Sequence, residues 1–386
     1  MRALIVEPQG DRGTLTATRA LTEAGWQVGV ASSAERTLAG RSRFASRCHR
    51  IGPAQEGVDE FVAGLNRAID ECGYEIVFCG AGDAEVTALS MRRDEIAATV
   101  PYPPHETVLR ALDKLELARA AERAGLGTPV TVEATADQLE RWEPPMVVKP
   151  RLHAPLAGDG GPSRLEATIT ADRRTASERA RKIRELGGVP LLQEQLSGEL
   201  MAFVIVADRE SRVVARCQQI VEATWPPGAG VSSRARTTAI DEDLAERVAA
   251  LVRELGWFGI ADIQFMRTGD GEPQVIDLNG RFYGSLALAV GAGANLPAVW
   301  AALATGREPA STADAAPGVR YQWLEGDLRR ALSERRGGRV RDLADCLRYA
   351  RGATHSVFKV TDPGPGMSAV ASLASRGARR AATGSG

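Results

Sequence analysis

The chain has 386 residues, a formal net charge of −1 and 25% charged residues of both signs. This length predicts two or three domains with well-filled cores, and the balanced charge gives no indication of a nucleic-acid or membrane surface. The five cysteines are scattered and form no C-x-x-C pair. We therefore expect reduced thiols in a cytoplasmic protein, without a zinc site.

The first 105 residues predict a Rossmann-like domain. Residues 2–7 form an apolar strand, residues 15–24 a helix and residues 27–31 a second strand. This βαβ order indicates a parallel, doubly wound sheet. The turn after the first strand, EPQGDRG, lacks the G-x-G-x-x-G motif, which disfavours a dinucleotide-dependent oxidoreductase.

Two acidic residues follow another buried strand, residues 75–79. Asp83 and Glu85 stand where parallel sheets bind ligands, although both acids could instead simply begin a helix. A cluster of three prolines at residues 101–104 then marks the best candidate for a domain boundary.

Lysine is scarce in this chain. Of the 48 basic residues, 44 are arginines and only four are lysines. The lysines are Lys114, Lys149, Lys182 and Lys359. A lysine that is kept against this bias more plausibly serves the chemistry of a compact ammonium group, and chance retention is the alternative for any one of them. Lys149 ends a short apolar strand, and a loop rich in glycine and proline follows it over residues 151–163.

The segment from residue 261 to residue 285 carries the most information. It predicts two strands joined by a Gly-Asp-Gly turn, and in the second strand Asp277, Asn279 and Arg281 alternate with apolar residues. A period of two places these three polar side chains on one face. Burying them costs free energy unless they have partners, and a metal-bound polyphosphate would satisfy all three.

In this order the motifs resemble the ATP-grasp superfamily over roughly residues 107–305, in particular the carboxylate–amine ligases related to the large subunit of carbamoyl-phosphate synthase. The resemblance implies an α/β chain in which a Rossmann-like pre-ATP-grasp domain precedes a two-subdomain α+β ATP-grasp fold. The implied divisions are a first domain (1–105), a small subdomain with a glycine-rich flap (106–192), a large subdomain with the metal site (193–307), and a helical C-terminal extension with a flexible tail (308–386).

The resemblance also implies a role for individual residues. Lys114 and Lys149 would reach the nucleotide phosphates, and Gly160, Gly161 and Ser163 would belong to the flap. Glu194, Gln195 and Leu196 would form the adenine hinge, with Glu199 at the ribose. Gln264, Asp277 and Asn279 would hold the metal, and Asp277, Asn279 and Arg281 would be catalytic. Arg234 and Arg236 are weaker candidates for contacts with the substrate.

Two hinge positions, Leu196 and Ser197, and two positions of the metal segment depart from the family pattern. Asp277 stands where a glutamate is commoner, and Gly280 replaces the proline of Asn-Pro-Arg. Because glycine frees the backbone, we expect Gly280 to loosen the strand end and to leave Arg281 less rigidly held.

The implied function is an ATP-dependent ligase. It would convert a carboxylate to an acylphosphate with release of ADP and couple it to an amine, and the expected substrates are amino acids or small metabolites. The implied cofactors are ATP and one or two Mg²⁺ ions, for which Mn²⁺ can substitute. We expect small-molecule partners, no nucleic acid or membrane, and compatibility with a homodimer. The alternative is a nucleotide-binding module of the same fold with impaired catalysis.

Overall fold

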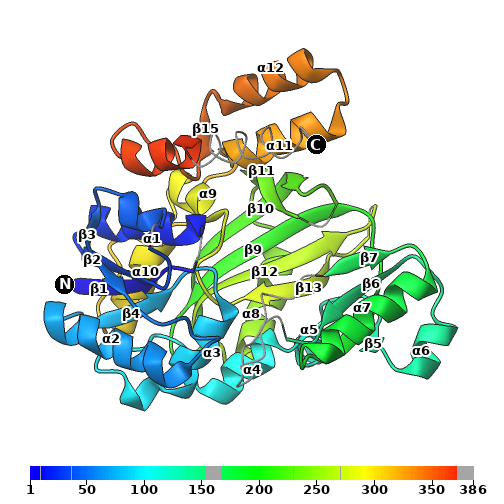
Figure 1. Cartoon of the computed structure of the whole chain (residues 1–386), viewed down its shortest axis with the longest axis horizontal. Helices are drawn as coiled ribbons and strands as arrows, with labels where there is room; N and C mark the ends of the chain where they lie inside the picture. The colour runs from blue at the N-terminus through cyan, green and yellow to red at the C-terminus, as the bar shows by residue number, and fades with distance from the viewer. Residues whose placement is uncertain (9, 36, 153–166, 229, 270, 372–386) are drawn as a thin grey trace, which may run out of the picture.

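The computed structural model describes residues 1–8, 10–35, 37–152, 167–228, 230–269 and 271–371. Within these residues the strands form three sheets of four, seven and four strands. Figure 1 shows the N-terminal sheet on the left, the seven-stranded sheet in the centre and the second four-stranded sheet on the right.

The N-terminal sheet confirms the Rossmann-like prediction, since its strands are parallel in the order β3-β2-β1-β4. The side chain of Asp11 caps the first helix by accepting hydrogen bonds from the amides of Gly13 and Thr14. The elements are β1 (Arg2–Val6), α1 (Arg12–Glu23), β2 (Gln27–Ser32), η1 (Ala39–Arg41), β3 (Ala45–Arg50), α2 (Val58–Cys72), β4 (Ile76–Cys79), α3 (Asp83–Met91) and η2 (Arg93–Glu95).

The second four-stranded sheet is antiparallel, in the order β5-β8-β6-β7. Apolar residues of β6 and β8 pack with Ala176, Ala180 and Ile183 of the charged helix α7, so that one helix face covers the sheet. The elements are β5 (Thr131–Glu133), α6 (Ala136–Arg141), β6 (Met146–Pro150), β7 (Thr168–Thr170), α7 (Arg173–Glu185) and β8 (Pro190–Glu194).

The central sheet has the order β13-β12-β9-β10-β11-β14-β15, and all its pairs are antiparallel except β14 with β15. The chain enters it from β8 through residues 195–198 and so passes from one sheet to the other at that point. The elements are β9 (Glu199–Ala207), β10 (Val213–Trp225), β11 (Val231–Thr237), α8 (Glu242–Leu255), β12 (Gly259–Arg267), β13 (Gln274–Asn279), α9 (Leu286–Gly291), α10 (Leu296–Ala304), β14 (Arg320–Gln322), α11 (Leu324–Glu334), α12 (Arg339–Ala350) and β15 (Ala353–His355).

Two helices connect the N-terminal domain to the second sheet: α4 (His105–Leu112) and α5 (Lys114–Arg123). Both helices pack against α8 and β13 of the central sheet. The sequence therefore leaves the first domain at residue 105 but does not enter the second sheet directly. This detour brings the N-terminus of α5 to the strand that carries Asp277.

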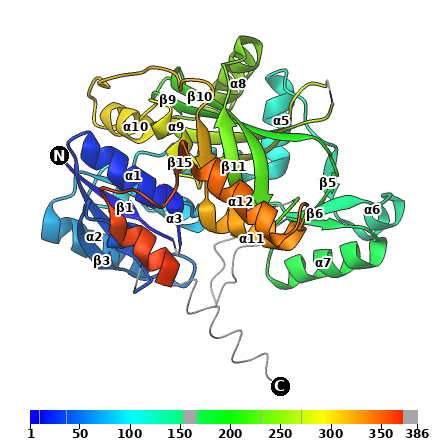
Figure 2. The same ribbon diagram turned by 90° about the horizontal axis from the view of Figure 1, so that it is seen from above.

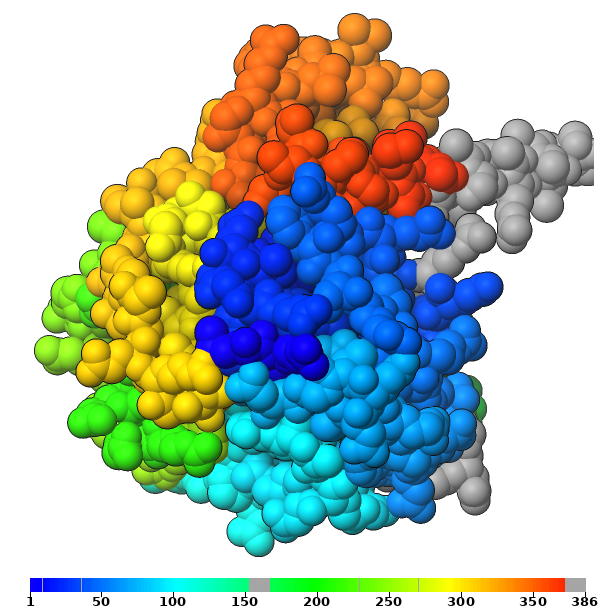
Figure 3. Space-filling model, turned by 90° about the vertical axis from the view of Figure 1, so that its left-hand side faces the viewer, coloured from blue at the N-terminus to red at the C-terminus, as the bar shows by residue number. Residues whose placement is uncertain are grey.

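The C-terminal region contains the helices α11 and α12 and also two short strands, β14 and β15, that extend the central sheet. Three-residue strands are too short to show a hydrophobic period, so the sequence does not predict them. Beyond them the chain returns to the N-terminal domain, where Asp362 pairs with Arg19 at 2.8 Å. Figure 2 gives the view from above, and Figure 3 shows the end of the described chain, in red, lying against the blue N-terminal domain.

Among the described helices, none is long and apolar enough to cross a bilayer.

Candidate functional site

Four polar side chains share one face of the β12–β13 hairpin. The register pairs Gln264 with Asp277 and Asp262 with Asn279, and residues two apart on one strand point to the same face. Sequence analysis selected three of these residues and missed Asp262. The signal was present, because the period of two that places Asp277 beside Asn279 equally places Asp262 beside Gln264.

Both lysines singled out in the sequence converge on this hairpin. Lys114 begins α5, and its Nζ lies 3.9 Å from Oδ1 of Asp277. Lys149 lies on β6, and its Nζ donates a hydrogen bond of 3.2 Å to the carbonyl oxygen of Ile276. Both side chains are buried, so two ammonium groups from separate elements meet at one acidic strand.

Burial affects the charge of Lys149 strongly. Desolvation, together with the neighbouring charge of Lys114, lowers its pKa from 10.5 to about 7, although Asp277 acts in the opposite direction. An anion bound beside Lys149 would stabilise its charged ammonium form, which burial disfavours. The pair of lysines is therefore suited to an anionic ligand such as a polyphosphate.

Asp262 orients the two amides of the hairpin. Its Oδ2 accepts hydrogen bonds from Nε2 of Gln264 at 3.4 Å and from Nδ2 of Asn279 at 3.3 Å. Its Oδ1 is buried and has no hydrogen-bond partner among the described residues. Burial also raises the pKa of Asp262 to about 6. By taking up the amide NH₂ groups, Asp262 leaves the carbonyl oxygen of Gln264 for a ligand.

Arg281 is held firmly at the end of β13. Its Nε donates to Oδ1 of Asp83 at 2.7 Å, and its Nη2 donates to Oδ1 of Asn279 at 2.9 Å. The ion pair is buried, with Arg281 4% and Asp83 8% exposed, and it joins the N-terminal domain to the hairpin. Asp83 also begins α3, so the two roles left open for it in the sequence coexist.

The expectation that Gly280 loosens Arg281 is therefore wrong. A Cβ at position 280 would lie 2.2 Å from the ring of Trp257, so the glycine makes room for the indole. Trp257 is itself buried, and a larger residue at position 280 would have to displace it. The glycine serves a tightly packed contact, not a flexible strand end.

The expected hinge lies where the chain passes between the two sheets. Glu194 ends β8, the amide oxygen of Gln195 is buried without a described partner, and Leu196 is half-buried. Glu199 begins β9 and pairs with Arg267. A Cβ on Gly198 would lie 2.0 Å from the carbonyl oxygen of Arg267, so only glycine allows this close approach.

The flap residues cannot be placed. Gly160, Gly161 and Ser163 lie outside the described residues, between β6 and β7, and their role stays a prediction.

The two weaker candidates, Arg234 and Arg236, face acids of the protein. Arg234 pairs with Asp327 and Asp345, both at 2.7 Å, and its guanidinium carbon lies 4.4 Å from the ring centroid of Tyr349. Arg236 pairs with Glu222 at 3.1 Å. Arg234 therefore fastens α11 and α12 to the sheet, which does not support the predicted contact with substrate.

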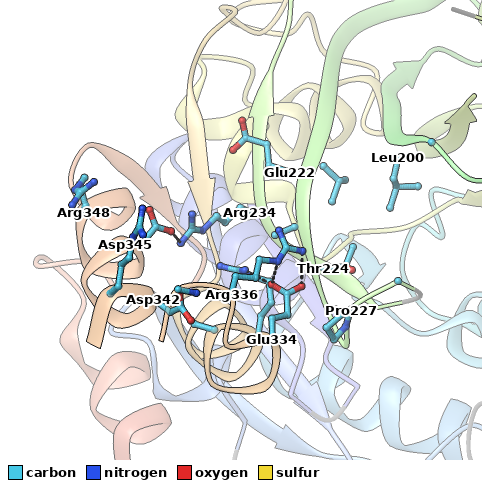
Figure 4. A pocket seen from close by; sticks show the side chains of 18 of the residues that line it. Leu200, Glu222, Thr224, Pro227, Arg234, Glu334, Arg336, Asp342, Asp345 and Arg348 are labelled. Carbon is cyan, nitrogen blue, oxygen red and sulfur yellow. Dashed lines mark hydrogen bonds and ion pairs between the residues drawn. The ribbon is translucent and has the colours of Figure 1, made fainter. Parts of the chain in front are cut away.

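Arg234 lines a cavity of about 760 Å³ between the central sheet and the α11–α12 hairpin. Figure 4 shows Leu200 and Thr224 on the sheet side and Asp345 and Arg348 on the helix side, with Arg336 bonded to Glu334. Leu200 and Met266 pair in register and share the sheet face of Gln264. The cavity thus opens on the same face as the polar hairpin.

The donor set suits Mg²⁺. Asp277 and Asp262 supply carboxylates, while Gln264 and Asn279 supply amide oxygens. The described residues contain no group of three His, Cys, Asp or Glu side chains able to enclose a metal alone. Such a site fits a Mg²⁺ ion that keeps water and substrate phosphate among its ligands.

Comparison with known proteins finds a family model that matches part of the chain. The family model described as "ATP-grasp in the biosynthetic pathway with Ter operon" matches residues 191–327, a range that includes the hinge and the whole polar hairpin. No curated protein matches the chain in sequence.

Several solved structures share the fold at low sequence identity. An L-amino acid ligase from Bacillus licheniformis has a TM-score of 0.57 and 18% identity, over 75% of this chain and 69% of its own. A biotin carboxylase from Campylobacter jejuni, crystallised with β,γ-ATP, has a TM-score of 0.63 and 14% identity, over 82% and 74% of the two chains. An N5-carboxyaminoimidazole ribonucleotide synthetase in complex with ADP has a TM-score of 0.62 and 13% identity, over 86% and 84%. Residues 191–327 thus match an ATP-grasp family model, and the chain shares the fold of these solved structures.

Proposed function

We propose that the chain is an ATP-dependent ligase that activates a carboxylate as an acylphosphate, releases ADP and couples the acyl group to an amine. One observation carries the proposal: Lys114 and Lys149 reach the β13 strand at Ile276 and Asp277, beside amide and carboxylate oxygens on one face. Buried cations beside metal-type ligands suit the phosphates of a nucleotide and are costly otherwise.

The residues suit phosphoryl transfer, which needs positioning and charge neutralisation more than covalent help. Asp277, Gln264 and Asn279 would hold Mg²⁺, which would supply positive charge to neutralise the phosphates of the nucleotide. Lys114 and Lys149 would neutralise the remaining phosphate charge. Asp262 would keep the Gln264 amide turned so that its oxygen faces the ligand, and Arg281 would fix the orientation of Asn279.

The solved structures of similar fold support the class of reaction. One is by its name an amino acid ligase and another a ribonucleotide synthetase with bound ADP. On this basis we propose an amino acid or small metabolite as substrate, one or two Mg²⁺ ions, and a cytoplasmic site of action without nucleic-acid or membrane partners.

The test is an ADP-release screen. The protein is supplied with ATP, Mg²⁺ and pairs of carboxylic acids and amines, and the coupled products are detected by mass. The proposal expects ADP release that needs both an acid and Mg²⁺. Release of AMP in place of ADP would refute the acylphosphate route.

A second candidate, a nucleotide-binding module with impaired catalysis, has one observation in its favour. Asp83 neutralises Arg281 in this structure, and Oδ1 of Asn279 accepts a hydrogen bond from the same arginine. That function predicts tight binding of ATP without ADP release for any pair in the screen.

A further inference from the structure

Arg12 is a buried cation that neither the fold nor the proposed phosphate site explains. We propose that Arg12 binds an anionic group on the amine substrate, and that Gln219 accepts a hydrogen bond from the amine of the same molecule. The inference rests on the proposed ligase function and names its second substrate: an amine that also carries a carboxylate or a phosphate, as an amino acid does.

The surroundings of Arg12 are aromatic, and none of the described acids pairs with it. The side chain is 9% exposed, its guanidinium carbon lies 4.0 Å from the ring centroid of Trp323, and its Nη1 donates to Oη of Tyr321 at 3.0 Å. Within the described part of the chain, no carboxylate lies within ion-pair distance of this guanidinium. Stacking on the indole holds the planar group in place and leaves its remaining N–H groups for a ligand.

Arg19 shows what a structural arginine looks like in this protein. It lies on the same helix, is 6% exposed, and pairs with Asp362 at 2.8 Å. Its Nη2 also donates to the carbonyl oxygen of Val357 at 2.9 Å. A buried charge is costly unless it is paired. Arg12 has no partner among the described acids, whereas Arg19 has one. An anion that binds with the substrate would supply that partner.

Arg12 lies next to the reacting region. A Cβ on Gly284 would be 2.8 Å from Nη2 of Arg12, and Gly284 follows Arg281 by three residues. The carbonyl oxygen of Gly284 accepts a hydrogen bond from Oη of Tyr321 at 2.9 Å, which is the hydroxyl that Arg12 contacts. The cation therefore lies beside the bend that leaves the polar hairpin.

Gln219 lies on β10, which contacts the Gly284–Ser285 bend. It faces the same side of the sheet as Gln264, because the register aligns Asp277, Gln264, Ala202 and Gln219 across four adjacent strands. Two strand spacings separate Gln219 from Gln264, about 10 Å. The Nε2 of Gln219 donates to Oγ of Ser285 at 3.0 Å, which fixes the amide.

The amide oxygen of Gln219 is a buried acceptor that the described residues leave unpaired. Gln219 is 2% exposed, and its Oε1 has no hydrogen-bond partner among the described residues. A buried acceptor without a donor costs free energy, and the N–H of an amine is a donor of the required kind. With an amine at Gln219 and an anion at Arg12, a short zwitterion would span the Gly284–Ser285 bend beside the phosphate site.

The experiment measures binding and turnover in parallel. The full chain, saturated with Mg²⁺ and a non-hydrolysable ATP analogue, is titrated with the twenty L-amino acids, with the corresponding amino acid amides, and with O-phosphoethanolamine against ethanolamine. Affinity is read from the shift in the thermal midpoint. The amides keep the amine and lose the anion. Comparison of the amino acids with O-phosphoethanolamine shows whether the site binds a carboxylate or a phosphate.

The expected result is that at least one anionic amine binds and its neutral counterpart does not. Arg12→Met weakens that binding about 10- to 100-fold, the range for a hydrogen-bonded charge, while the KM for ATP stays unchanged. Gly284→Ala weakens it as well, since the new methyl group displaces the guanidinium. Arg19→Met, the matched control, lowers the midpoint of the ligand-free protein but keeps the discrimination.

Three results would overturn the proposal: no anionic amine binds, the amides bind as well as the acids, or Arg12→Met keeps the discrimination. Failure of the ligase function looks different. If binding depends on Arg12 but no ADP is released, the ligase function is refuted but the subsite is not. If ADP is released at equal rates with the amino acids and with their amides, the subsite is refuted but the ligase function is not.

Discussion

Replacing Lys149 by methionine should stabilise the ligand-free protein while it abolishes nucleotide binding. Lys149 is buried, and its pKa falls from 10.5 to about 7. The folded protein therefore binds fewer protons than the unfolded chain between these two pH values. By linkage, the stability of the wild type rises with pH across this window. Below pH 7 the buried ammonium destabilises the folded protein by its full amount.

The magnitude follows from the two pKa values. At pH 7 the cost of Lys149 is about 4 kcal/mol, and at pH 9.5 it is about 1 kcal/mol. Methionine removes this cost but leaves the carbonyl of Ile276 without its hydrogen bond, a loss of about 1 kcal/mol. The net gain at pH 7 is about 3 kcal/mol, which corresponds to a rise of about 4 °C in the midpoint for a chain of this length.

The assay is thermal unfolding at pH 7 and at pH 9.5, without nucleotide and with EDTA. Lys149→Met should unfold at a higher temperature than the wild type at pH 7, and the difference should nearly vanish at pH 9.5. Lys182→Met, which replaces an exposed lysine, is the control and should change neither midpoint. A midpoint at or below that of the wild type at pH 7 would refute the reasoning.

Three further outcomes are expected. Asp277→Asn should abolish Mg²⁺-dependent ADP formation with unchanged circular dichroism, and full activity would contradict its role as a metal ligand. Binding of ATP at pH 8 should take up close to one proton, because phosphate raises the pKa of Lys149 from about 7; calorimetry in buffers of different ionisation enthalpy measures this uptake, and an enthalpy independent of buffer would exclude it. Gly280→Ala should lower stability by about 1–3 kcal/mol through its contact with Trp257, as measured by thermal unfolding, whereas an unchanged midpoint would show that the indole can move.

The parts of the site that the sequence predicts all depend on patterns within a short stretch of the chain. Alternation along β13 predicted the common face of Asp277 and Asn279, and a short apolar strand predicted the position of Lys149. The scarcity of lysine marked four lysines, and the resemblance to the ATP-grasp superfamily selected the two that the structure brings to the same strand. Asp262 belongs to this class as well, because extending the alternation to β12 predicts it.

The parts that the sequence does not predict are contacts between distant segments. Arg281 and Asp83 are 198 residues apart, and Arg12 and Tyr321 are 309 apart. No periodicity links such pairs, and only the packing of the N-terminal domain on the central sheet brings them together. The same holds for Gly280, whose role depends on Trp257 of a neighbouring segment and not on the freedom of its own backbone.

The central claim is that a substrate carboxylate takes the γ-phosphoryl group of ATP. The most direct test supplies the acid identified in the ADP-release screen with ¹⁸O in its carboxylate and analyses the released phosphate by mass. The expected products are ADP and phosphate that carries one ¹⁸O atom from the acid. Unlabelled phosphate, or AMP in place of ADP, would contradict it.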